Sequence, residues 1–207
     1  MTASGCLKHQ INDKGDHMTK LTLDQARSIL AKNCDDEHLL LHALAVSAAM
    51  GAMAEHFGAD PEYWQAVGYL HDVDYQHFPE EHLSHTRELL EPEGVDEEDI
   101  RAILSHGWGL CSDVEPLSDV EKSLFTVDEL TGIVMANALM RPTGIADMDV
   151  KSVNKKFKDK RFAAKCDREV IRKGCELLGM ELAEVIDLVI RGMRSEMDAL
   201  GIGPKEQ

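Results

Sequence analysis

The sequence lacks the cysteine patterns of disulfide-stabilised and zinc-binding proteins. It has an odd number of cysteines, and no two of them form a Cys-x-x-Cys pair: Cys6, Cys34, Cys111, Cys166 and Cys175. Neither a disulfide framework nor a zinc ribbon is therefore indicated. Reduced thiols are the simplest interpretation, and they favour a cytoplasmic protein.

The sequence also lacks an uninterrupted apolar run of about 18 residues, which a membrane-spanning helix requires. Its first residues, MTASGCLKHQINDKGDHM, have no apolar core of the kind found in signal peptides. We therefore expect no membrane association. Residues 1–20 are expected to form a flexible tail, and Met18 is an alternative native start.

Basic residues are scarce relative to acidic ones. Lysine and arginine total 22, aspartate and glutamate total 38, and the formal net charge is -16. Such an acidic surface argues against binding to nucleic acids or anionic membranes, because both ligands are negatively charged. The 207 residues are 43% hydrophobic, which is typical of a globular protein, and residues 21–207 are expected to form a single domain.

The spacing of apolar residues and helix caps predicts an all-α fold. Thr22 and Gln25 open a helix that ends near Asn33, and Ser118 with Glu121 forms a second capping box. Further helices are expected at residues 37–57, 61–71, 79–90, 97–105, 167–179 and 181–200. No alternating strand pattern and no repeat is present. We expect a helical bundle with the site in its core, and the helices of residues 149–200 packed on it.

The adjacent pair His71-Asp72 is the most informative feature, together with His42 upstream and Asp128 downstream. These residues offer two imidazole nitrogens and two carboxylates, a mixture that suits a first-row divalent metal better than calcium. Apolar residues surround Asp128, and a buried carboxylate requires a partner such as a metal ion. Its neighbour Glu129 faces about 100° away around a helix, and we expect it to be solvated or to support the ligands indirectly.

The strings LLLHALAVSAAM, AVGYLHDVDY, RAILSHGW and LFTVDELTGIV contain His42, His71-Asp72, His106 and Asp128 in that order. Together they resemble the HD superfamily of metal-dependent phosphohydrolases, most closely its small stand-alone HD or HDIG-type hydrolases. The resemblance implies that His42, His71, Asp72 and Asp128 bind a divalent ion, with manganese, iron, nickel, cobalt, zinc and magnesium all possible.

The dinuclear branch of that superfamily has two further histidines, which would here be His82 and His106. The resemblance implies that Asp72 bridges two ions, and that Asp72, His82 and His106 are catalytic as well as metal-binding. His85 is an alternative, as a ligand or as a substrate contact. The family often has a second histidine directly after the position of His106, where this chain has Gly107.

Two features concern substrate binding. The family often has a phosphate-binding lysine three residues after the aspartate of the pair, and this chain has Tyr75 there, either as a hydrogen-bond donor to a substrate oxygen or as a packed surface residue. Residues 151–173 contain ten of the 22 basic residues. They form either a solvated helix face or a phosphate clamp, for which the candidates are Lys155, Lys156 and Arg161.

The resemblance thus implies a hydrolase that acts on a small soluble phosphate ester or nucleotide through a metal-activated hydroxide. Two alternatives stay open: a di-iron oxygenase of the myo-inositol-oxygenase-like branch, and a metal-stabilised binding domain without turnover.

Overall fold

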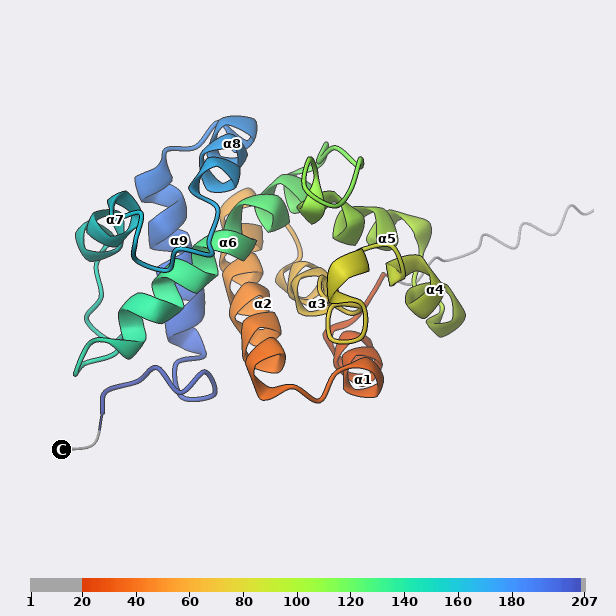
Figure 1. Cartoon of the computed structure of the whole chain (residues 1–207), viewed down its shortest axis with the longest axis horizontal. Coiled ribbons are helices and arrows are strands. Elements are labelled where there is room, and N and C mark those ends of the chain that lie inside the picture. The colour runs from red at the N-terminus through yellow and green to blue at the C-terminus, as the bar shows by residue number, and fades with distance from the viewer. Residues whose placement is uncertain (1–19, 206–207) are drawn as a thin grey trace, which may run out of the picture.

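The computed structural model describes residues 20–205, and the tail expected over residues 1–20 lies almost wholly outside that range. Within it the chain forms nine α-helices and no named strand, which confirms the all-α prediction (Figure 1). Three short 3-10 turns complete the structure: η1 (Pro79–Glu81), η2 (Glu91–Glu93) and η3 (Ser105–Gly107). The helices are α1 (Leu23–Asn33), α2 (Glu37–Phe57), α3 (Pro61–Leu70), α4 (Thr86–Leu90), α5 (Glu97–Leu104), α6 (Asp119–Leu139), α7 (Val150–Lys158), α8 (Arg168–Leu178) and α9 (Leu182–Ser195).

Local capping explains why the long helices begin and end where they do. The side chain of Asp36 accepts hydrogen bonds from the backbone N–H groups of His38 and Leu39 at the start of α2. Gly58 ends that helix in the left-handed conformation, with a φ of 65°. The capping box of Ser118 and Glu121 opens α6 as the sequence predicts.

Helix α2 lies at the centre of the fold and packs against α3, α6 and α9 (Figure 1). By length and composition it is the one helix in residues 20–205 that could cross a membrane, although the sequence was expected to contain no such run. Its apolar stretch is 61% buried inside the fold. Burial of this kind is typical of the core helix of a globular domain.

The C-terminal helices cover α2 and α6. Helix α9 packs on α2, α8 packs on α6, and α7 contacts both α9 and α6. The approach of α9 to α2 is close, because a Cβ atom at Gly192 would collide with the backbone carbonyl of Ala48. A glycine at this position therefore allows the two helices to meet backbone to backbone.

One predicted helix is wrong. The sequence suggested a continuous helix over residues 79–90, whereas η1 ends at Glu81 and α4 begins only at Thr86. Between them Leu83 has a φ of 70°, a left-handed conformation that a helix cannot contain. The break turns His82 and His85 in different directions, although they are only one helical turn apart in the sequence.

Candidate metal centre

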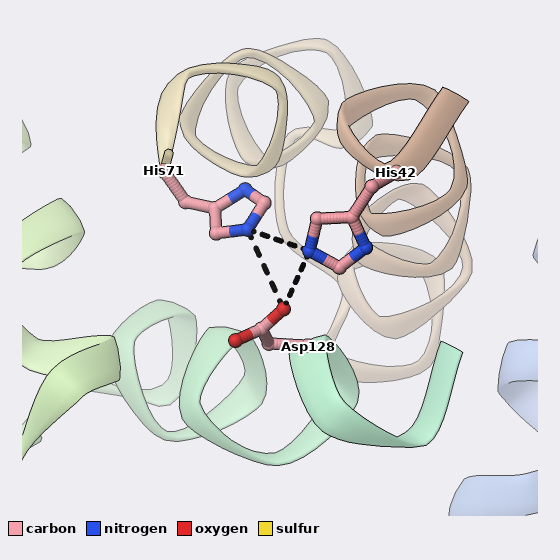
Figure 2. Close-up of side chains that lie close together, drawn as sticks. All are labelled: His42, His71 and Asp128. Carbon is pink, nitrogen blue, oxygen red and sulfur yellow. Dashed lines mark hydrogen bonds and ion pairs between the residues drawn. The ribbon is translucent and has the colours of Figure 1, made fainter. Parts of the chain in front are cut away.

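Three helices bring the first group of candidate ligands together (Figure 2). His42 lies on α2, Asp128 lies on α6, and His71 is the C-cap residue of α3. The Nε2 atoms of His42 and His71 are 3.1 Å apart, and Oδ1 of Asp128 lies 2.9 Å and 3.4 Å from them. Oδ2 of Asp72 completes the group, 3.3 Å from Nε2 of His71. We call these four residues the first ligand group.

A second group forms on the other side of Asp72. The Nε2 atoms of His82 and His106 are 3.2 Å apart. Oδ1 of Asp72 lies 3.3 Å from the first of these atoms and 3.6 Å from the second. The two oxygens of Asp72 thus face two different groups of nitrogens. We call His82, His106 and Oδ1 of Asp72 the second ligand group.

Hydrogen bonds on the far side of each ring orient these histidines. The Nδ1–H of His71 donates to the carbonyl of Gly68 at 2.8 Å, and the Nδ1–H of His106 donates to the carbonyl of Ile103 at 2.7 Å. A carbonyl can only accept, so the neutral rings carry their lone pairs on Nε2. These lone pairs face other imidazole nitrogens and carboxylate oxygens, which repel them. A cation bound between these atoms would remove the repulsion. The residues present therefore fit one or two divalent metal ions.

The charges of the metal-free groups lead to the same conclusion. Burial lowers the pKa of His71, but the negative charges of Asp72 and Asp128 outweigh it and hold that pKa well above its usual value. Burial also opposes protonation of His82, yet its contacts with Asp72 and Asp74 raise its pKa to about 9. Burial raises the pKa of Asp128, and the neighbouring histidines reverse this and keep it well below its usual value. Without an ion, protons occupy the positions where a metal would bind.

Every residue of the two ligand groups except the fully buried His71 lines a cavity of about 420 Å³. Tyr75 also lines it, with its ring edge-on to the ring of His82 at a centroid distance of 5.0 Å. The cavity wall contains Leu39, Gly107, Leu110, Cys111, Glu129, Gly132, Lys165, Cys166 and Val170 as well.

Glu129 belongs to the site, not to the solvated surface. Its side chain lines the cavity, and its Oε2 accepts a hydrogen bond from the backbone N–H of Asp167 at 2.9 Å. Burial, followed by the negative charge of Asp128, raises the pKa of Glu129 to about 7. Of the two options left open for Glu129, the solvated one is therefore wrong, because a distant part of the chain hydrogen-bonds to its carboxylate.

Asp74 is a residue that the sequence analysis missed. It is fully buried, and its Oδ1 lies 2.9 Å from Nδ1 of His82. Its Oδ2 accepts from the backbone N–H of His85 and from the hydroxyl of Thr86. The available signal was a second aspartate two residues after the His-Asp pair, in the string HDVDY.

His85 does not reach the cavity. Its Nε2 contacts Glu81 at 3.0 Å, its Nδ1 contacts Glu88 at 3.3 Å, and its ring stacks on Phe78. The structure therefore places it outside both ligand groups, and its role as a ligand or substrate contact loses its geometric basis. The broken helix over residues 82–85 is the reason.

The predicted phosphate clamp is also placed elsewhere. Lys155 lines a separate surface hollow of α7, the ammonium of Lys156 lies over the ring of Phe162, and Arg161 is exposed beside Asp159. Val153 and Phe157 are the buried residues of α7, so the lysines of this helix face outward. The basic side chain at the cavity is Lys165.

The glycine after His106 has a steric explanation. A Cβ atom at Gly107 would collide with the side chains of Leu83 and Cys111. The second histidine that the family often has at this position would therefore not fit without a shift of its neighbours.

Comparison with known proteins agrees with this geometry. Residues 39–130 match the family model described as HD domain. The comparisons with curated proteins and with solved structures found no match. The matched part contains every residue of both ligand groups, which come from α2, α3, α6 and the turns between α3 and α6. Residues 39–130 therefore form an HD domain, as the motifs of the sequence indicated.

Proposed function

We propose that this protein is a metal-dependent phosphohydrolase that acts on a small soluble phosphate ester or nucleotide. The observation that carries the proposal is the position of Asp72, whose two oxygens face two separate pairs of imidazole nitrogens beside an open cavity. The HD domain supports a metal-dependent hydrolase, and the substrate class is our inference from the size and polarity of the cavity.

The two ligand groups define which residues would hold metal. His42, His71, Asp72 and Asp128 would bind one divalent ion, and His82, His106 and Asp72 would bind a second. When bound, such ions provide a nucleophile from water at neutral pH and offset negative charge on the phosphoryl oxygens. The neutral tautomer that each Nδ1 hydrogen bond selects keeps Nε2 free for this purpose.

Other cavity residues are suited to bind substrate and to move protons. The hydroxyl of Tyr75 can donate a hydrogen bond to a substrate oxygen. Glu129 has a pKa of about 7, so its carboxyl can both take and give a proton near neutral pH at the oxygen that does not accept from Asp167.

The cavity dimensions favour a small substrate. A volume of about 420 Å³ suits a sugar phosphate or a mononucleotide better than a polymer. The net charge of -16 also disfavours a nucleic-acid substrate, because the phosphate backbone would be repelled along most of the surface. A cytoplasmic location remains a further proposal, which rests on the cysteine pattern.

The decisive experiment combines metal analysis with turnover. Protein purified without chelators is assayed for phosphate release from phosphomonoesters and nucleotides, with each divalent ion added in turn. We expect release that is lost on chelation and in the Asp72→Ala variant, and retained in the Asp24→Ala variant, which changes an exposed aspartate on α1. Iron near two per chain without phosphate release would favour the oxygenase. Full metal loading without any turnover would favour a binding domain.

A further inference from the structure

The loop between α7 and α8, residues 159–167, brings a positive charge to the cavity. Among the described residues that line the cavity, Lys165 is the only lysine or arginine. The same wall contains the carboxylates of Asp72, Asp128 and Glu129. Asp72 and Asp128 belong to the ligand groups and would be neutralised by metal. The ammonium of Lys165 is then the positive side chain of the wall that can bind an anion.

Arg168 organises this loop from within. Its side chain is buried, with a relative exposure of 9%, and the guanidinium lies inside the loop. Its distances to the carbonyls of Ala163 and Cys166 are both 2.7 Å. In all, the guanidinium donates to five backbone carbonyls, those of Phe157, Asp159, Phe162, Ala163 and Cys166. A planar guanidinium with five donors can satisfy such a set, and an ammonium cannot.

Two further features show that the loop has one defined conformation. Ala163 has a φ of 42°, a left-handed conformation that an alanine adopts only when its surroundings impose it. The N–H of Asp167 donates to Glu129, which ties the end of the loop to α6 next to Asp128. The C-terminal end of the loop is therefore fixed beside the cavity, two residues after Lys165.

The other basic residues of the segment have different partners. Lys156, Arg172 and Lys173 lie over the rings of Phe162, Phe157 and Trp108 respectively. Lys151, Lys155 and Lys158 line the separate hollow along α7. The positive charge of residues 151–173 is thus spread over the surface, and a single lysine reaches the cavity.

We propose that Lys165 binds the phosphate group of the substrate and that Arg168 is a positioning residue, which holds the loop in the conformation that presents Lys165. This inference rests on the proposed phosphohydrolase function and names the side chain that recognises the phosphate. A charge-assisted hydrogen bond from an ammonium to a phosphate oxygen is the expected contact.

The test measures binding of inorganic phosphate to metal-loaded protein by calorimetry, together with KM and kcat for a phosphomonoester. In Lys165→Ala we expect phosphate affinity to fall on the order of tenfold and KM to rise by a similar factor, as the loss of one charge-assisted contact implies. Metal content should be unchanged, and Lys165→Arg should retain most of the affinity. The matched controls Lys156→Ala and Arg161→Ala remove the same charge from the same segment, and they should bind phosphate as the wild type does.

The results separate the two levels of the proposal. Equal phosphate affinity and equal KM in the wild type and Lys165→Ala, with hydrolysis intact, would overturn the role of Lys165 and leave the proposed function standing. A metal-loaded wild type that neither binds phosphate nor releases it from any ester would overturn both.

Arg168 is tested by substitution with lysine, which keeps the charge and loses the planar set of donors. We expect weaker phosphate binding and a higher KM at a temperature where the variant is folded, with metal content retained. Arg161→Lys is the control, since Arg161 is exposed in the same loop. A lower melting temperature without any change in phosphate affinity would show that Arg168 is merely structural and would overturn its positioning role.

Discussion

Asp74 holds His82 toward the metal centre: Oδ1 of the buried carboxylate lies 2.9 Å from Nδ1 of the imidazole. The other oxygen of Asp74 accepts from the backbone of His85 and from Thr86, at the start of α4. One carboxylate thus selects the tautomer of His82 and stabilises the break between η1 and α4. Carboxylates that hydrogen-bond a metal-binding histidine in this way raise its basicity and fix its direction.

The first prediction concerns this carboxylate. Asp74→Ala should lower the affinity of the second ligand group for metal by about 10–100-fold, because His82 loses the acceptor that orients its ring. The first ligand group should keep its affinity. Titration of metal into the chelated variant, followed by calorimetry, measures both sites, and Asp113→Ala changes an exposed aspartate as a control. Identical titrations for Asp74→Ala and the wild type would contradict the role of Asp74.

The second prediction concerns Asp72. Asp72→Ala should abolish binding of both ions and all activity, because its two oxygens face both ligand groups. Elemental analysis of purified protein measures the metal content directly. An undiminished metal content in this variant would refute the assignment of the metal centre.

The third prediction separates the two ions. His82→Ala and His106→Ala should each lose about one ion per chain, since their Nε2 atoms lie 3.3 Å and 3.6 Å from Oδ1 of Asp72. His85→Ala is the matched control, because that ring contacts Glu81 and Glu88 outside the cavity. If both variants kept the full metal content of the wild type, the assignment of a second ion to His82 and His106 would be wrong.

The fourth prediction concerns pH in metal-free protein. The pKa of His82 is raised from 6.5 to about 9 in the folded chain, so protonation of His82 favours the folded state. This stabilisation is fully present below about pH 6.5 and is lost as the pH rises through about 9. Urea unfolding of chelated protein should therefore show a free energy of unfolding that falls over this range, by roughly 3 kcal/mol at most.

A bound ion should remove that dependence. Metal takes the place of the proton on Nε2, so loaded protein should lose little stability between pH 6.5 and 9. His82→Ala, unfolded without metal, should lack the part of the slope that His82 contributes. The same slope in metal-free wild type and His82→Ala would contradict this account.

Local signals in the sequence determined most of the secondary structure. Capping residues such as Thr22, Asp36 and Ser118 act within one helical turn, so they mark helix starts without any knowledge of the fold. The order His42, His71-Asp72, Asp128 likewise indicated the HD domain, because these residue types and their neighbours recur together in that family. Both kinds of information are carried by short stretches of chain.

Tertiary structure alone decided which of several similar residues reach the site. His82 and His85 differ because Asp74 stabilises a break that helical periodicity does not predict. Lys165 lies at the cavity whereas Lys155 and Lys156 do not, because the buried Arg168 gathers the loop while the apolar face of α7 turns its own lysines outward. Burial in the cavity wall and the negative charge of Asp128 raise the pKa of Glu129, and the backbone N–H of the distant Asp167 donates to its carboxylate. Each outcome depends on contacts between distant parts of the chain. Residue type and local spacing do not predict such contacts.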